Sequence, residues 1–158
     1  LATAGGMGLT GLILKLRFQM IPVTSSWIRQ TIHKAKNLDE LLDRFESTHQ
    51  STYSVAWVDC LSSGKDLGRS HLILGEHADP GELPSEKKNL SISLDMSQKL
   101  FVPVQLPSGI LNSLNIQVFN CLYYNKIQNW ESSKFVSLLS FFYPLDSIHN
   151  WNRIEFAG

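Results

Sequence analysis

The feature that most constrains the fold is a capped amphipathic helix that begins at Asn37, between two segments with the character of β-strands. Asn37 is a favourable N-cap residue, and Glu40 follows at the three-residue spacing of a capping box. The apolar residues of this segment recur at helical spacing and form one stripe: Leu38, Leu41, Leu42 and Phe45. A helix with a single apolar stripe buries it against another layer of structure, so we expect this helix to cover a sheet.

Four segments around this helix have the patterns of strands. Leu14–Met20 alternates strictly between apolar and polar residues, which predicts a half-buried strand. Trp27–Lys36 is more polar, and we expect it near an edge of the sheet. Tyr53–Leu61 is apolar enough to be covered on both faces, and His71–Glu76 predicts a further strand.

The second half of the chain is less regular. Residues 78–89 hold two prolines and several charges, which predicts a loop or lid. Residues 110–124 favour a helix over a strand, and 134–143 predict a strand that Pro144 ends. This order of elements predicts an α+β fold, in which an antiparallel sheet carries helices on one face.

The composition excludes several classes of protein. The 158 residues carry a formal net charge of zero, so we expect no nucleic-acid partner. No apolar run is long enough to form a transmembrane segment. Two cysteines, Cys60 and Cys121, are too few for a disulfide scaffold, and we expect both to be reduced and buried in a cytoplasmic protein.

Both ends of the chain favour an internal fragment of a longer protein. The chain begins with a glycine-rich stretch without an initiator methionine or a signal peptide, and it ends at Gly158 without a polar tail. We expect such a fragment to expose apolar surface, through which a homodimer can form.

The short motifs of the sequence do not identify a binding or metal site by themselves. Gly6, Gly8 and Gly11 match the letters of the dinucleotide-binding fingerprint, but that fingerprint lies between a strand and a helix, and here a predicted strand follows. A glycine-rich turn explains the same spacing. The histidines have no metal-ligand spacing, so we expect no metal site. Trp57 and Trp151 are either core residues or walls of an apolar pocket.

Three separated blocks of the sequence resemble one enzyme family. They are Thr3–Ile13, Tyr53–Asp59 followed by Leu67–Arg69, and Phe141–Asp146 followed by Asn150–Arg153. The first resembles the FAD-linked oxidases of the vanillyl-alcohol-oxidase type. The other two resemble the decaprenylphosphoryl-β-D-ribose 2′-oxidase branch of that group.

The resemblance implies a two-domain flavoenzyme that extends beyond this chain at both ends. Residues 1–20 would be the C-terminal end of the FAD-binding domain, and residues 21–158 the N-terminal part of the substrate (cap) domain. FAD would be contacted by Gly11, Leu12 and Ile13. The substrate pocket would include Trp57, Phe142, Leu145 and Trp151.

The same resemblance implies an oxidoreductase that oxidises a sugar hydroxyl by hydride transfer to flavin, with a small or lipid-linked sugar as substrate. No catalytic residue would lie in this chain, so alone it should be inactive and bind no FAD. Phe142 and Ile148 stand where the best-known members have a tyrosine and a phenylalanine, which leaves the sugar open. The alternatives are an aldonolactone oxidase of the same superfamily and a non-enzymatic α+β ligand-binding module.

Overall fold

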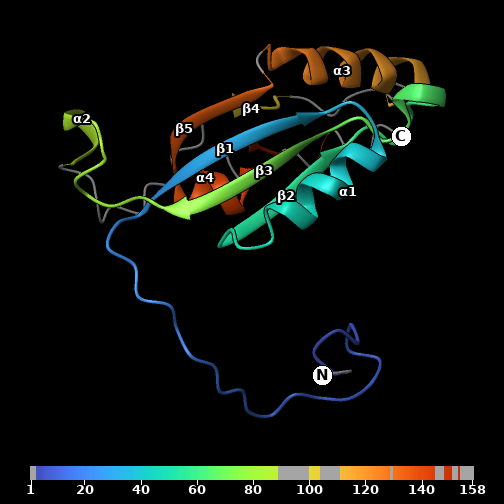
Figure 1. Ribbon diagram of the computed structural model, residues 1–158. Coiled ribbons are helices and arrows are strands. Elements are labelled where there is room, and N and C mark those ends of the chain that lie inside the picture. The colour runs from blue at the N-terminus through green and yellow to red at the C-terminus, as the bar shows by residue number, and fades with distance from the viewer. Residues whose placement is uncertain are drawn as a thin grey trace.

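A four-stranded antiparallel sheet forms the centre of the protein in the computed structural model, which describes residues 3–88, 100–103, 111–128, 130–144, 148–150 and 153 (Figure 1). The strand order is β2-β3-β1-β5. These strands are β1 (Trp27–Ala35), β2 (Tyr53–Val58), β3 (Ser70–His77) and β5 (Glu131–Ser137). The two longest strands, β1 and β3, therefore lie in the middle.

Helices and short connections complete the described chain. The helices are α1 (Leu38–Ser47), α2 (Ser85–Lys88), α3 (Ser113–Lys126) and α4 (Leu138–Phe142), with a 3-10 turn at Gly64–Asp66. A short parallel pair joins β4 (Leu100–Phe101) to β6 (Ile148–His149). The predicted α+β class with an antiparallel sheet is confirmed.

Helix α1 begins where the sequence predicts it. The Asn37 side chain accepts a hydrogen bond from the Glu40 backbone N–H at 3.0 Å. The Glu40 carboxylate in turn accepts from the Lys36 N–H at 2.9 Å, one residue earlier than in the usual capping box. The α1 side of the sheet is a core of Ala35, Leu41, Leu72 and Leu74, against which Phe45, Ala56 and Val58 pack.

Helices lie against both faces of the sheet rather than one. Side chains alternate along a strand, so Ala56 faces α1 while Trp57 faces the other way. On that second face the Trp57 ring lies 4.7 Å from the ring of Tyr123 in α3. Phe142 of α4 meets Tyr53 edge-on at 4.9 Å on the same face.

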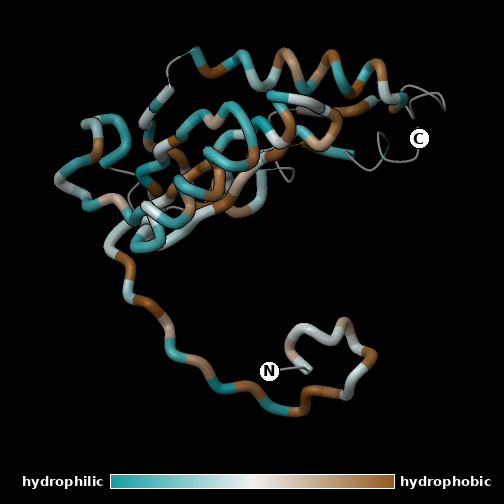
Figure 2. The backbone as a smooth tube through the Cα atoms, turned by 45° about the vertical axis from the view of Figure 1, so that its right-hand side comes forward, coloured by the Kyte–Doolittle hydropathy of each residue, from teal (hydrophilic) through white to brown (hydrophobic). Residues whose placement is uncertain are grey.

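The segment Leu14–Met20 is not a strand in this structure, which corrects the prediction. It runs away from the sheet as extended chain (Figure 1), and Figure 2 shows hydrophobic and hydrophilic residues alternating along it. Its apolar side chains, Leu14, Leu16, Phe18 and Met20, are between 66% and 87% exposed. A strand requires backbone hydrogen bonds to a neighbour, and no described strand pairs with this segment.

The predicted edge position of the strand at residues 27–36 was wrong. The polar strand β1 is central, because its polar side chains find partners: Arg29 pairs with Glu82 at 3.1 Å, and Lys34 donates to the Ile127 carbonyl at 3.2 Å. The more apolar β2 is an edge strand, and Val55 is about half exposed.

The predicted strand at residues 134–143 is correct only in its first half. β5 ends at Ser137, whose hydroxyl accepts a hydrogen bond from the Ser140 N–H and begins α4. The predicted helix at 110–124 is confirmed as α3, which begins at Ser113, and the described part of the predicted loop, residues 78–88, contains only the short α2. No helix in the described part of the chain is long and apolar enough to cross a membrane.

Leu41→Ala should destabilise the protein by about 2–5 kcal/mol, because Leu41 is 3% exposed and its loss leaves a cavity between α1 and the sheet. Leu42→Ala, one residue along the same helix but at a side chain that is 52% exposed, should cost less than about 0.5 kcal/mol. Urea unfolding of both variants measures the difference. Equal losses would show that α1 does not pack through Leu41.

Candidate functional site

The candidate site is a group of aromatic rings between the sheet and α3. We call Trp57, His71, Tyr123 and Tyr124 the aromatic cluster. The Trp57 ring lies 5.4 Å from His71 on the neighbouring strand and 4.7 Å from Tyr123. His71 stacks on Tyr124 at 5.5 Å with 11° between the ring planes. The half-buried indole of Trp57 is therefore held from two sides, by β3 and by α3.

His71 is neutral at pH 7 in this environment. Its Nε2 lies 3.1 Å from the Tyr124 carbonyl oxygen, which only accepts, so Nε2 carries the proton. Burial lowers the pKa of His71 below its usual value; the Tyr124 hydrogen bond opposes this shift and the positive charge of Lys34 adds to it. A neutral, buried imidazole with its donor engaged acts here as a packing group.

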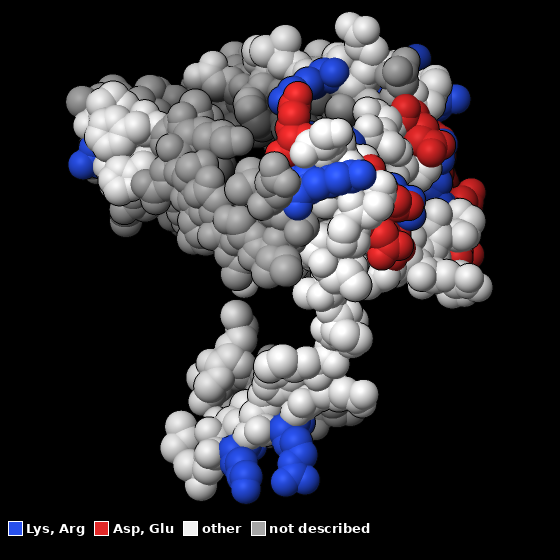
Figure 3. All heavy atoms as spheres, turned by 90° about the vertical axis from the view of Figure 1, so that its left-hand side faces the viewer, with Lys and Arg blue, Asp and Glu red and all other residues white. Residues whose placement is uncertain are grey.

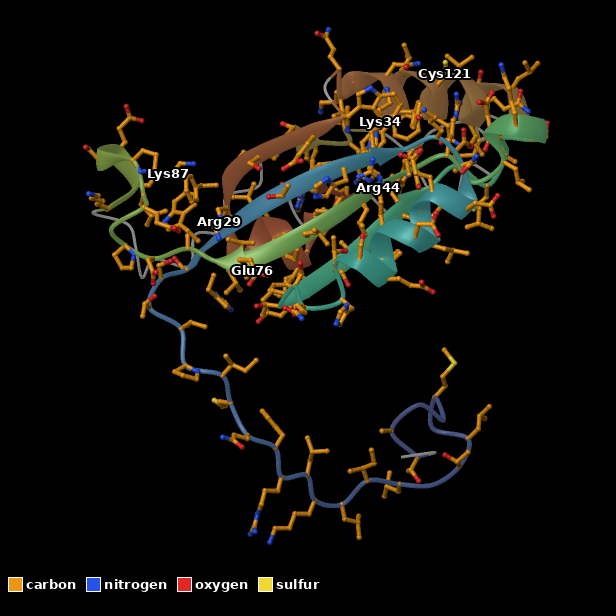
Figure 4. All side chains as sticks on the ribbon, viewed as in Figure 1. Arg29, Lys34, Arg44, Glu76, Lys87 and Cys121 are labelled. Atoms are coloured by element: carbon orange, nitrogen blue, oxygen red, sulfur yellow. The ribbon has the colours of Figure 1, made fainter. Side chains whose placement is uncertain are left out.

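Lys34 is a buried ammonium beside the cluster. It projects from β1 toward α3 (Figure 4) and is 9% exposed. Its Nζ lies 4.1 Å from the centroid of the Tyr124 ring and donates to the Ile127 carbonyl. Among the described residues no carboxylate forms an ion pair with it, so the ring and the carbonyl offset the cost of burying the charge.

A buried ion pair lies at the end of β2, next to the cluster. Asp59 is 2% exposed; its Oδ2 accepts a hydrogen bond from Nε of Arg69 at 2.9 Å and lies 2.9 Å from Nη2 in the same ion pair. Its Oδ1 accepts from Asn120 of α3 at 2.7 Å and from the Leu61 N–H at 3.1 Å. Burial alone would raise the pKa of Asp59, but these hydrogen bonds and the guanidinium charge hold it below the usual value.

The turn between β2 and β3 brings Arg69 opposite Asp59. Gly68 has a φ of +73°, and a Cβ there would lie 2.8 Å from the Leu38 Cβ, so the close approach of this turn to α1 requires glycine. The Gly68 N–H donates to the Ser62 hydroxyl at 3.2 Å. A hollow of about 340 Å³ opens beside the ion pair and is lined by Asp59, Leu61, Ser62, Ser63, Asp66, Arg69 and Gln117.

The structure separates the predicted pocket residues. Trp57 lies in the aromatic cluster near the end of β2, whereas Phe142 contacts Tyr53 at the beginning of the same strand and on the same face. Leu145 and Trp151 lie outside the described residues.

The residues predicted to contact FAD lie on the N-terminal segment, away from the sheet (Figure 1). Gly11 has a φ of +150°, and the side chains of Leu12 and Ile13 are exposed. Accessible backbone amides and apolar side chains fit the ring system of a flavin. Residues 3–13 contain no cationic side chain for the pyrophosphate, so this segment fits only part of an FAD site.

The two cysteines are free and exposed, which corrects the expectation that they are buried. Cys60 lies just beyond the end of β2, and Cys121 lies on α3 (Figure 4). Within the described ranges, no three His, Cys, Asp or Glu side chains form a group that could hold a metal ion. Figure 3 shows acidic and basic side chains interspersed on one part of the folded body, and basic side chains alone on the segment that runs away from it.

Sequence reasoning missed His71, Tyr123 and the partners of Asp59. The available signal was a pair of opposite charges, Asp59 and Arg69, on either side of a glycine-containing turn. Asn120 gives no local signal, because it lies 61 residues from the carboxylate that it contacts.

Known proteins resemble this chain over most of its length. No family model matches it. It is 33% identical over 156 residues to a decaprenylphosphoryl-β-D-ribose oxidase from Mycolicibacterium smegmatis, covering 96% of this chain and 33% of that protein. It is 34% identical over 114 residues to an uncharacterised protein in the mprA 5′ region of Streptomyces coelicolor, covering 72% and 30%. The chain thus spans about a third of the length of these curated relatives.

The stability of the protein should fall as the pH drops below neutral because of His71. Its pKa is lower in the folded state than its unfolded value of about 6.5, so protonation favours unfolding. The stabilisation is complete above about pH 6.5 and is lost as the pH falls toward the folded-state pKa. Above about pH 5 the Glu40 and Asp59 carboxylates, whose pKa values are lowered, remain ionised in both the folded and the unfolded state. They therefore add little to the pH dependence of stability.

Urea unfolding between about pH 7.5 and pH 5 measures this effect, with His71→Gln as the comparison because glutamine keeps an N–H donor for Tyr124. The variant should show a flatter dependence on pH. If the free energy of unfolding depends on pH with the same slope in both proteins, His71 is not the cause of the pH dependence.

Proposed function

We propose, from the premise that this chain is homologous to the decaprenylphosphoryl-β-D-ribose oxidase family, that it is part of an FAD-dependent oxidoreductase acting on a sugar hydroxyl. The observation that carries the proposal is the 33% identity to a named oxidase over 96% of this chain. The aromatic cluster on the α3 face of the sheet supports it, because rigid rings are suitable walls for a sugar pocket.

In this proposal the chain contributes to two domains. Residues 1–20 belong to the FAD-binding domain, and residues 21–158 begin the substrate domain. The exposed, alternating side chains of the N-terminal segment support this division, because such a segment has the pattern of a strand whose partner lies elsewhere in the enzyme. Gly11, Leu12 and Ile13 would then approach the flavin.

Trp57 is the residue of this chain that we assign to the substrate. Contacts from β3 and α3 hold its indole, so the ring can orient a sugar and exclude water without moving. Phe142, on the same sheet face, and Leu145 and Trp151 would complete the wall. A phenylalanine at 142 offers no hydroxyl to the substrate, so contact there is apolar.

The chemistry needs a hydride acceptor and a base, and the described residues around Trp57 supply neither. FAD, when bound, would supply the acceptor for the hydride of the carbinol carbon, and a base would take the hydroxyl proton, so that a ketone would result. The acceptor atoms of Asp59 are engaged by three hydrogen bonds and the ion pair with Arg69, and His71 is only 2% exposed, so neither reaches a substrate as a base. We therefore place the base in the remainder of the enzyme.

The full-length gene product that contains these residues tests the proposal. Loaded with FAD and given decaprenylphosphoryl-β-D-ribose with a dye as electron acceptor, it should reduce the dye. Trp57→Ala should lower kcat/KM by about 100-fold, because a displaced substrate reacts poorly. The control Trp130→Phe changes an exposed tryptophan and should alter kcat/KM by less than about 2-fold.

Two outcomes would count against the proposal. One is a full-length protein without a flavin absorbance spectrum. The other is equal kcat/KM for the two tryptophan variants. The 158-residue chain purified alone should be colourless, since its glycine-rich segment offers only part of an FAD site.

A further inference from the structure

We propose that Asp59 and Arg69 are positioning residues for Trp57: their buried ion pair, joined to α3 through Asn120, sets which face of α3 meets the indole. The role in substrate binding rests on the proposed function, but the positioning itself is a property of this chain. Neither residue was among the predicted site residues.

The ion pair extends the β2–β3 ladder beyond its last regular pair. Val58 pairs with Ser70, and the next backbone hydrogen bond runs from the Asp59 N–H to the Arg69 carbonyl at 3.0 Å. Side chains two residues apart on a strand project to the same side. The Asp59 carboxylate therefore emerges on the face that carries Trp57, which is also the face that α3 covers.

Helix α3 meets this face at two points along its axis. Asn120 donates to the Asp59 carboxylate at 2.7 Å, and the Tyr123 ring lies 4.7 Å from Trp57. Residues three apart lie on the same side of a helix, so one orientation of α3 satisfies both contacts. Rotation of the helix about its axis would break them together.

Hydrophobicity alone does not select this orientation. The outer surface of α3 is also apolar, and its exposed residues include Leu114, Val118, Phe119 and Leu122. Burial of those residues against the sheet would be comparably favourable. A buried polar contact, by contrast, is costly to break, and polar contacts of this kind specify register between packed helices. The Asp59–Asn120 hydrogen bond, together with the bonds of Tyr124 to His71 and to the Ala35 carbonyl, therefore selects the Tyr123 face.

Arg69 offsets the free-energy cost of burying the Asp59 carboxylate. A buried carboxylate with only an amide and a backbone N–H as partners would be strongly destabilised, whereas the Arg69 guanidinium neutralises it through one hydrogen bond and an ion-pair contact. The same guanidinium lies 5.0 Å from the centroid of the Tyr124 ring in the aromatic cluster. Arg69 therefore contacts both the carboxylate and the helix that it orients.

The test follows the ring environment of Trp57 directly. The chain is labelled with 5-fluorotryptophan, and its four tryptophan resonances are observed by fluorine NMR, with Trp57 assigned through Trp57→Phe. Asn120→Ala removes the contact from α3 and leaves the ion pair intact. We expect the Trp57 resonance to shift by more than its linewidth, while the Trp27 resonance stays in place.

Asn125→Ala is the matched control, because it makes the same substitution on the same helix at an exposed residue that bonds only within α3. It should leave the Trp57 resonance unchanged. Asp59→Asn, which removes the ion pair, should shift the resonance as Asn120→Ala does. If Asn120→Ala lowers the urea midpoint but leaves the Trp57 resonance in place, the contact is merely structural and the proposal fails.

This readout needs neither flavin nor sugar, so it is separate from the test of the proposed function. A shifted resonance together with a fully active Trp57→Ala enzyme would support the positioning role and refute the role of Trp57 in substrate binding. In the full-length enzyme, Asn120→Ala should lower kcat/KM by about 10-fold through Trp57. Asn120→Ala should cause little further loss of kcat/KM in an enzyme that already carries Trp57→Ala.

Discussion

The antiparallel pairing of β1 with β3 is the constraint on which the rest of the structure depends. Eight consecutive residue pairs, from Ile28 with His77 to Ala35 with Ser70, set the register. That register puts Leu72 and Leu74 on the side of α1 and His71 on the side of α3. A slip of one residue would exchange the two faces, burying His71 in the apolar core and exposing the leucines.

The two faces of the sheet that this register defines have different roles. The α1 face is aliphatic and stabilises the fold by burial of apolar side chains. The opposite face holds rings, a buried ammonium and a buried ion pair, whose geometry is specific but whose net contribution to stability is small. The residues that we connect with substrate binding lie on the face where orientation matters more than burial.

The sequence predicted best where the signals were local. The Asn37 cap and the apolar stripe of α1 each depend on residues a few positions apart, and this helix is confirmed. The order of strands was not predictable in this way, because Lys34 is accommodated at the centre by a carbonyl 93 residues further on. Asp59 likewise meets Asn120 only after α3 has folded back onto the sheet. Of the candidate site, Trp57 could be named from its motif, but its partners could not.

The failed prediction at residues 14–20 shows what alternation does and does not establish. Burial of a leucine, phenylalanine or methionine side chain contributes about 1.5–3 kcal/mol, while ordering each residue of a chain costs about 1–2 kcal/mol of backbone entropy. Only every second residue of this segment is apolar, so burial of one face roughly balances the entropy of all the residues. Backbone hydrogen bonds to a neighbouring strand are then needed to make the ordered strand more stable than the unpaired chain. Alternation therefore describes the surface that such a segment requires, and it becomes a strand only where that surface is present.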